Sequence, residues 1–123
     1  MPSTLIPKSK AFGTSCEELA AAYLKASGYK IVETNFRTKS GEIDIVAEKD
    51  DFLIFVEVKG RRTTKYGLPQ EAVTPWKQAS IRKVAQIFIQ KRRLEHKNIR
   101  FDVVAITFDK NNIPQIEHIP FAF

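Results

Sequence analysis

Two short runs in the middle of the chain, residues 43–48 and 52–59, are rich in Val, Ile and Phe. A polar break that contains Asp50 and Asp51 separates them. Apolar β-branched and aromatic runs on either side of such a break are typical of a β-hairpin. The pattern therefore predicts two antiparallel strands joined by a two-residue turn, with side chains alternating between the two faces of a sheet.

The charged residues of this hairpin fall together. Glu57 and Lys59 share a face of the second strand and lie about 6.6 Å apart, at two strand rises. With Asp50 and Asp51 as the turn, counting outward places Asp44 opposite Glu57, and opposed carboxylates repel one another. A bound divalent cation would offset that repulsion, and Lys59 would add a second cation or a catalytic group. A one-residue change in the turn would move Asp44 to the other face of the sheet.

Alternation also sorts the first strand. It groups Asp44 with Glu42 and Val46, and it places Ile43, Ile45 and Ala47 on the opposite face. A second interpretation of the same charges needs no metal, because Glu57 and Lys59 could join Asp44 in a cross-strand network of ion pairs. Both interpretations require that Asp44 turns toward Glu57.

A helix is predicted over residues 15–27, where apolar residues recur at helical spacing. Thr14 or Ser15 supplies the N-cap, and Gly28 stops the helix. Glu17 lies at the edge of the apolar stripe, from which a carboxylate can reach across the face of a packed sheet. The spacing Thr14-x-x-Glu17 also matches a capping box, in which Glu17 would only close the start of the helix.

Three further strands are expected. The first covers residues 29–35, with Ile31 its clearest inward residue, and residues 35–41 connect it to the hairpin. The next covers residues 99–108. Residues 113–118 then form an edge strand, where the proline in this segment is tolerated.

A second helix starts at Thr74-Pro75, an N-cap followed by a proline at the first helical position, and runs to about Arg93. Its buried stripe is Ile81, Val84, Ala85 and Phe88. The connection from the hairpin through this helix to residues 99–108 is long enough for a parallel crossover. These elements predict an α/β fold with a mixed central sheet flanked by helices.

Composition narrows the class of protein. The chain has 123 residues, 43% of them hydrophobic, and a net charge of +6. That size predicts one domain over residues 13–123, preceded by a flexible arm over residues 1–12. The basic balance favours an anionic partner such as nucleic acid. Cys16 is the single cysteine, which suits the reducing cytoplasm, and we expect neither a signal peptide nor a membrane span.

Three motifs resemble a known family: Gly41-Glu42-Ile43-Asp44, Phe55-Val56-Glu57-Val58-Lys59 and Arg100-Phe101-Asp102-Val103-Val104. Together they look like the uncharacterised YraN family of bacterial proteins, within the PD-(D/E)XK nuclease superfamily and related to Holliday-junction-resolvase-type endonucleases. The resemblance runs over residues 13–106. It implies a restriction-endonuclease-like αβββαβ core.

The resemblance also implies a function, the hydrolysis of phosphodiester bonds in DNA, including branched or structured DNA. Mg²⁺ or Mn²⁺ would be held by Asp44, Glu57, the carbonyl of Val58 and Glu17, and Lys59 would hold the attacking water or the scissile phosphate. These four side chains, Glu17, Asp44, Glu57 and Lys59, are the expected catalytic residues. Kinship with resolvases suggests a symmetric homodimer. The alternative is a non-catalytic nucleic-acid-binding or accessory protein that keeps the fold.

Several polar residues near this site are candidates for contacts with nucleic acid: Arg37, Lys39, Arg61, Arg62, Lys65, Lys77 and Gln78. Most protein–nucleic acid contacts go to phosphate and sugar, which cations suit. Such residues are equally expected on any solvated surface. Asp102 is expected to be a structural carboxylate paired with a base, and His118 to be a surface residue.

Overall fold

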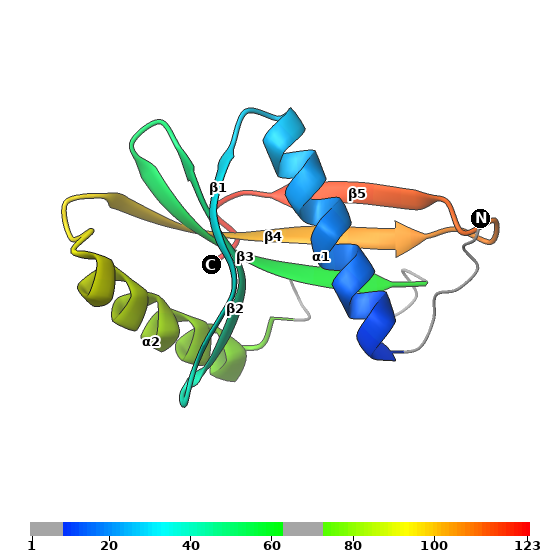
Figure 1. Ribbon diagram of the computed structural model, residues 1–123. Coiled ribbons are helices and arrows are strands. Elements are labelled where there is room, and N and C mark those ends of the chain that lie inside the picture. The colour runs from blue at the N-terminus through cyan, green and yellow to red at the C-terminus, as the bar shows by residue number, and fades with distance from the viewer. Residues whose placement is uncertain (1–8, 63–72) are drawn as a thin grey trace.

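A computed structural model describes residues 9–62 and 73–123, with side chains described from Ser15 onward. Within these residues, two helices and five strands follow one another (Figure 1). Their order is α1 (Ser9–Ala26), β1 (Lys30–Thr38), β2 (Gly41–Lys49), β3 (Phe52–Arg61), α2 (Pro75–Arg92), β4 (Asn98–Phe108) and β5 (Pro114–Ile119).

The strands form one mixed sheet in the order β1-β2-β3-β4-β5. β3 and β4 are parallel, linked through α2, and the other neighbours are antiparallel. Asp50, with φ of 55°, makes the two-residue turn that pairs Lys49 with Phe52. The predicted fold class, hairpin register and parallel crossover are therefore confirmed, and the sheet with its two helices is consistent with a restriction-endonuclease-like core.

Each helix covers one face of the sheet, and Figure 1 shows α1 and α2 on different faces. The core against α1 contains Cys16, Ala20, Leu24, Ile45, Ala47, Ile54, Val56, Val104 and Ile106. The core against α2 contains Val46, Leu53, Phe55, Ile81, Val84, Ala85, Phe88, Phe101 and Val103. The alternation read from β3 and the buried stripe of the second helix are thus confirmed, because neighbouring residues of β3 enter different cores.

α2 begins as its sequence predicts. The Thr74 hydroxyl accepts a hydrogen bond from the amide of Lys77 at 3.2 Å, and Pro75 occupies the first helical position. At the other end Arg93 adopts a left-handed conformation, with φ of 55°, and closes the helix. Lys91 and Arg92 in the last turn complement the partial negative charge of the helix C-terminus.

Three predicted boundaries are wrong. α1 begins at Ser9, so residues 9–12 are helical rather than part of an arm, and residues 1–8 lie outside the described residues. Thr14 and Ser15 are consequently inside the helix, which removes the N-cap and capping-box interpretations. β1 continues to Thr38, because its antiparallel pairing with β2 extends to Gly41, where a connecting loop was expected.

The paired ends of β1 and β2 leave the sheet as a two-stranded arm. Pairing between β2 and β3 stops at Ile45 and Val56, whereas β1 and β2 stay paired to Gly41. Figure 1 shows this arm curling toward the start of α2. Two-stranded ribbons twist more strongly than wide sheets. Because of this twist, Ile43 lies in the core against α2, whereas alternation predicted it on the other face of the sheet, with Ile45 and Ala47.

A close contact fixes the tip of the arm on α2. The Ser80 hydroxyl donates a hydrogen bond to the Ser40 carbonyl at 2.8 Å. Gly41 has φ of 143°, and a Cβ at this position would lie 2.7 Å from Ser80 Oγ. Glycine is therefore required at Gly41 both for its backbone conformation and for its closeness to the helix.

No helix within residues 9–62 and 73–123 is both long enough and apolar enough to cross a membrane.

Candidate metal and nucleic-acid site

A cleft opens where β2 parts from β3 beside the first turn of α2. Its volume is about 370 Å³. The lining residues are Lys39, Ser40, Gly41, Glu42, Asp44, Glu57, Trp76, Lys77, Ser80 and Ile81. The cleft exists because the arm leaves the sheet at Ile45, so residues that would otherwise be covered by a neighbouring strand face an opening.

Asp44 lies at the centre of this region and is half-buried. Its Oδ2 accepts a hydrogen bond from the amide of Val58 at 2.9 Å. Burial and, to a smaller extent, the nearby charges of Glu57, Glu17 and Glu42 together raise the pKa of Asp44 to about 8. The predicted closeness of Asp44 to Glu57 is thus supported by their electrostatic interaction.

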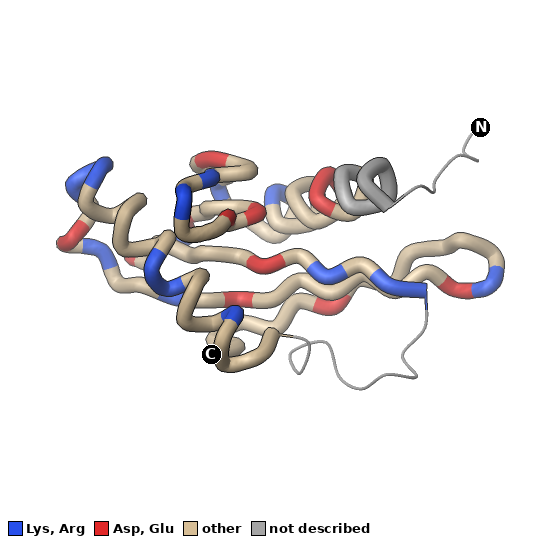
Figure 2. Tube along the Cα trace, turned by 90° about the horizontal axis from the view of Figure 1, so that it is seen from below, with Lys and Arg blue, Asp and Glu red and all other residues tan. Residues whose placement is uncertain are grey.

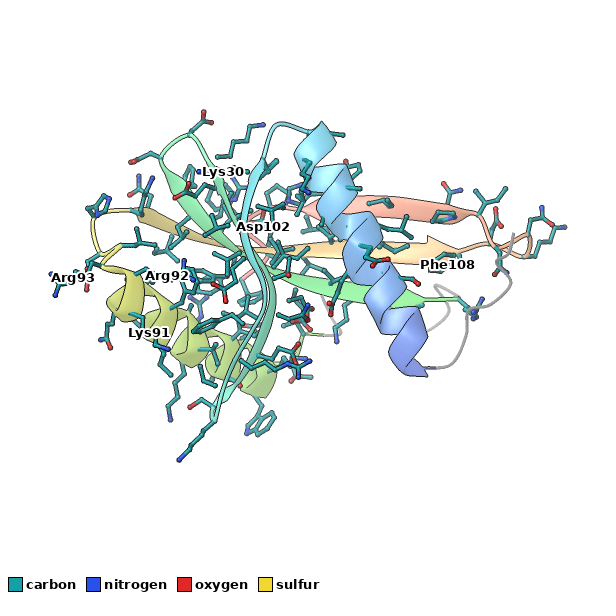
Figure 3. The ribbon with its side chains drawn as sticks, viewed as in Figure 1. Lys30, Lys91, Arg92, Arg93, Asp102 and Phe108 are labelled. Carbon is teal, nitrogen blue, oxygen red and sulfur yellow. The ribbon has the colours of Figure 1, made fainter. Side chains whose placement is uncertain are left out.

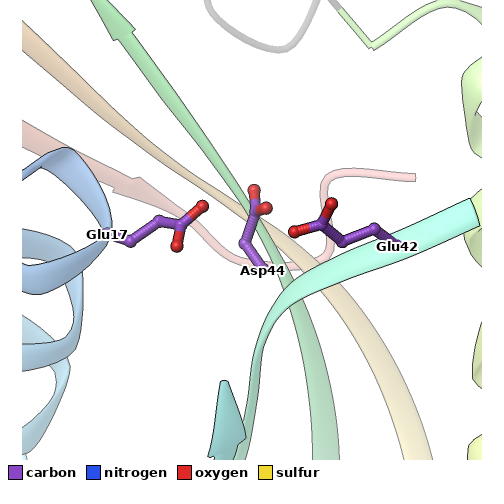
Figure 4. Close-up of side chains that lie close together, drawn as sticks. All are labelled: Glu17, Glu42 and Asp44. Atoms are coloured by element: carbon purple, nitrogen blue, oxygen red, sulfur yellow. The ribbon is translucent and has the colours of Figure 1, made fainter. Parts of the chain in front are cut away.

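Asp44 forms a cluster with two other carboxylates. One oxygen each of Glu17, Glu42 and Asp44 lies within 4.8 Å of the other two. Figure 4 shows Glu17 reaching in from α1 and Glu42 from the β2 arm, with Asp44 between them. Burial raises the pKa of Glu17, although hydrogen bonds with Asp44 and Asn35 oppose the shift. A hydrogen bond between two carboxyl groups requires a shared proton, so a proton compensates this cluster when no cation does.

Glu57 has different neighbours. Its side chain is 6% exposed, and its Oε2 lies 3.0 Å from Lys77 Nζ and 3.5 Å from Lys59 Nζ. The predicted grouping of Glu57 with Lys59 is confirmed. Lys77 joins them from α2, so two ammonium groups lie beside Glu57, whereas other carboxylates surround Asp44.

The residues present fit a hard divalent cation. Mg²⁺ prefers oxygen ligands and binds through one or two carboxylates while keeping several waters. Asp44 with Glu17 or Glu42 supplies such a set within 4.8 Å, and Glu57 stands next to it. Val58 contributes its amide to Asp44, so the role of its carbonyl as a ligand stays a prediction.

The predicted nucleic-acid residues divide into two groups. The first group lies at or near the cleft. Lys39 and Lys77 line it, and Arg37 pairs with Glu42 on the arm at 3.5 Å. Alternation along β3 places Arg61 on the same face as Glu57 and Lys59.

Arg62 follows the last residue of β3 and does not line the cleft, and its Nη1 donates to Asn112 Oδ1 at 3.0 Å. Gln78 uses its amide to donate to the Val73 carbonyl at 3.0 Å and is not among the residues that line the cleft, whereas Lys77 is. Lys65 lies outside the described residues.

Charge differs between the elements that meet at the cleft. α2 carries basic residues and no acidic one, whereas α1 and β2 supply Glu17, Glu42 and Asp44 (Figure 2). The acidic cluster is therefore set beside a basic helix. A polyanion approaching α2 would meet positive charge before it reached the carboxylates.

Glu42 was missed as a site residue, although the sequence held a signal for it. Alternation had already placed Glu42 on the face of Asp44, but the three motifs drew attention to Glu57 instead. Lys77 was expected only at phosphate, and its contact with Glu57 depends on how α2 packs against the sheet, which no local pattern reveals.

Asp102 is fully buried and belongs to a separate network (Figure 3). Its carboxylate accepts hydrogen bonds from Arg100 at 2.9 and 2.7 Å and from the amide of Phe121 at 3.2 Å, and it lies 2.7 Å from His118 Nε2. The prediction of a structural carboxylate paired with a base is confirmed. His118 is 11% exposed rather than a surface residue, because β5 places it diagonally across from Asp102.

Comparison with known proteins agrees with the three motifs. Residues 16–106 match the family described as "Uncharacterised protein family UPF0102". The chain belongs to this family. It is the family to which the YraN resemblance pointed, so that prediction is confirmed.

Relatives within UPF0102 align over most of their length. A UPF0102 protein of Geobacter sulfurreducens is 50% identical over 115 residues, which cover 94% of this chain and 90% of the relative. One from Syntrophus aciditrophicus is 50% identical over 107 residues, 87% of this chain and 84% of the relative. A third, from Syntrophomonas wolfei, is 49% identical over 107 residues, 87% and 92%. The family name carries no activity, so function has to be argued from the site.

Proposed function

We propose that this UPF0102 protein is a Mg²⁺- or Mn²⁺-dependent endonuclease that hydrolyses phosphodiester bonds in DNA. One observation carries the proposal: Glu17, Glu42 and Asp44, from two separate elements, bring carboxylate oxygens within 4.8 Å of one another beside Glu57. Acidic groups packed this closely repel, and a protein under selection for stability alone would avoid the arrangement. A divalent cation bound among these carboxylates would offset their repulsion.

Asp44 is the central ligand in this proposal. It is held in place by the amide of Val58, and Glu17 or Glu42 completes the carboxylate set. A bound Mg²⁺ would supply a water of lowered pKa and neutralise charge that develops on the phosphate. The chain itself provides the rest: Lys59, next to Glu57, holds the attacking water or the scissile phosphate, and Lys39 with Lys77 attracts the DNA backbone.

The direct test combines calorimetry with cleavage assays. Wild-type protein is titrated with Mg²⁺ and Mn²⁺ and incubated with linear duplex, single-stranded and branched DNA. Asp44→Asn should abolish cation binding and cleavage while leaving the circular dichroism spectrum unchanged. Glu18→Gln is the matched control, because Glu18 is exposed and follows Glu17 on α1. Cleavage by Asp44→Asn at the wild-type rate under matched metal would end the proposal.

A second function has its own support. Glu57 already lies between Lys59 and Lys77, at 3.5 and 3.0 Å, so part of the site is neutralised without any metal. This arrangement favours a nucleic-acid-binding or accessory protein that does not cut. Salt-dependent binding of DNA with no heat of Mg²⁺ or Mn²⁺ binding and no cleavage would select this function.

A further inference from the structure

Trp76 is the single tryptophan of the chain, and its side chain lies on the surface. It is the second residue of α2, and its side chain is 82% exposed. A tryptophan contributes most to stability when its large ring is buried. Here the ring adds little to the core, and Thr74 and Pro75 start the helix without it.

Other exposed hydrophobic side chains differ from Trp76 in their surroundings. Within the described part of the chain, Tyr23 meets the ring of His118 at 6.4 Å, and Phe121 meets the ring of Phe52 at 5.6 Å. Ile113 is exposed immediately before β5. No ring or cation contact involves Trp76 among the described residues, and of these four side chains it alone lines the cleft.

The walls of the cleft combine three kinds of group. Asp44 and Glu57 are acidic, Lys39 and Lys77 are basic, and Trp76 offers a flat apolar ring. The volume of about 370 Å³ falls in the range of sites that hold small molecules, which begins near 300 Å³. A cation-and-carboxylate site for a phosphodiester therefore has an aromatic platform at its rim.

We propose that Trp76 stacks on an unpaired nucleobase adjacent to the phosphate in the cleft, so that the substrate is nucleic acid with unpaired bases rather than continuous duplex. Every base has a face that can stack on an aromatic ring, but in a duplex that face is covered by the neighbouring base pair. A single strand, a flap or an open junction exposes it. The inference rests on the proposed function only in that the cleft receives a phosphodiester.

The fluorescence of Trp76 tests this directly, since no other tryptophan contributes. Wild-type protein without divalent cations is titrated with an oligothymidylate of about 12 nucleotides, a length within the usual range of single-strand sites. A duplex of the same length is titrated in parallel, and binding of both is followed independently by the anisotropy of a labelled strand. We expect quenching by the single strand and little by the duplex.

Variants separate stacking from other effects. Trp76→Ala should weaken binding of the single strand about tenfold, the size expected when a stacked base is lost, and Trp76→Phe should restore most of it. Ile113→Ala, an exposed hydrophobic truncation outside the cleft, should bind like wild type. Because Trp76 is 82% exposed, its substitution should leave the melting temperature unchanged.

The outcomes distinguish this inference from the proposed function. Anisotropy that reports single-strand binding with unchanged tryptophan fluorescence, or equal quenching by duplex, overturns the stacking role and leaves the nuclease proposal standing. Quenching of wild type by the single strand, together with weaker single-strand binding of Trp76→Ala by anisotropy, in a protein that cleaves nothing with Mg²⁺ or Mn²⁺, leaves the stacking role standing and overturns the catalytic proposal. Absence of binding to both the single strand and the duplex overturns the stacking role, and cleavage assays with Mg²⁺ or Mn²⁺ then decide the nuclease proposal.

Discussion

Asp44 and Asp102 are carboxylates of the same sheet, the first half-buried and the second fully buried, and their surroundings shift their pKa values in opposite directions. Burial would raise the pKa of Asp102, but hydrogen bonds from His118 and Arg100 outweigh it and hold the pKa below its usual value. Burial together with the charges of Glu57, Glu17 and Glu42 raises the pKa of Asp44 to about 8. One aspartate is fully compensated within the chain and the other is not.

The two carboxylates therefore differ in where their partners come from. The Asp102 network closes on itself, since every partner of the carboxylate is a donor from β4, β5 or the C-terminal segment. The Asp44 cluster lies beside an open cleft, and Asp44 itself accepts a hydrogen bond from the amide of Val58 while three acidic side chains surround it. Perturbed carboxylates of this kind gather at functional sites, and the predictions below test the distinction between the two aspartates.

The largest effect should come from breaking the closed network. Asp102→Ala leaves the guanidinium of Arg100 buried without its carboxylate, and loss of one partner of such a pair costs about 3–5 kcal/mol. The free energy of unfolding from urea denaturation measures it. Glu117→Ala, which removes an exposed carboxylate of β5, is the control and should cost less than about 0.5 kcal/mol. Equal losses in the two variants would contradict a compensated role for Asp102.

The same type of change at Asp44 should stabilise the protein. Asp44→Asn removes the repulsion from Glu57, Glu17 and Glu42 while keeping an oxygen to accept from Val58. Without divalent cations at about pH 8, the free energy of unfolding should rise by about 1–3 kcal/mol, part of what the pKa shift represents. Glu18→Gln, also on the acidic side of the site, should change it little. A destabilised Asp44→Asn protein would show that the cluster is structural.

The two aspartates should give opposite responses to pH. The raised pKa of Asp44 means that the folded protein keeps a proton that the unfolded chain releases, so its contribution to stability is lost as pH rises from about 4 to about 8. The lowered pKa of Asp102 means that its contribution is present above the unfolded value and is lost as pH falls through the folded one. Unfolding free energies of wild type and Asp44→Asn across this range should converge near pH 4 and separate toward pH 8. Added Mg²⁺ should close the separation at high pH, and parallel curves throughout would argue against the shift.

The smallest effect concerns Glu42, the ligand candidate on the arm. Its side chain is 38% exposed and already meets Arg37 at 3.5 Å, so Glu42→Gln should weaken Mn²⁺ binding only about two- to fivefold, the size expected for partly exposed charges. Calorimetric titration of wild type, Glu42→Gln and Glu17→Gln ranks the three carboxylates. A complete loss of binding in Glu42→Gln alone would move the centre of the site from Asp44 to the arm.

Local sequence patterns predicted much of the fold. The turn at Asp50 and Asp51 fixed the hairpin register, because the alternation of apolar residues on both strands allows only one pairing that buries both apolar faces. Thr74 and Pro75 fixed the start of α2, because capping depends on neighbours in sequence. The grouping of Glu57 with Lys59 followed from strand geometry alone.

The predictions that proved wrong depended on packing between distant segments. Ile43 lies in the core against α2, because the arm twists where β3 no longer pairs with it. His118 lies next to Asp102, because β5 pairs with β4. α1 begins at Ser9 although Thr14 and Ser15 are good N-caps, so a strong local signal is not by itself a boundary.

From the sequence alone it follows which residues of this protein carry charge and which residues of β3 share a face, because side chains alternate along a strand. That Glu17 and Glu42 complete the group around Asp44, and that Lys77 contacts Glu57, depends on how distant segments pack together. The reason is physical: the free energy of a carboxylate depends on every charge and dipole within several ångströms, and those neighbours come from segments that meet only when the chain folds.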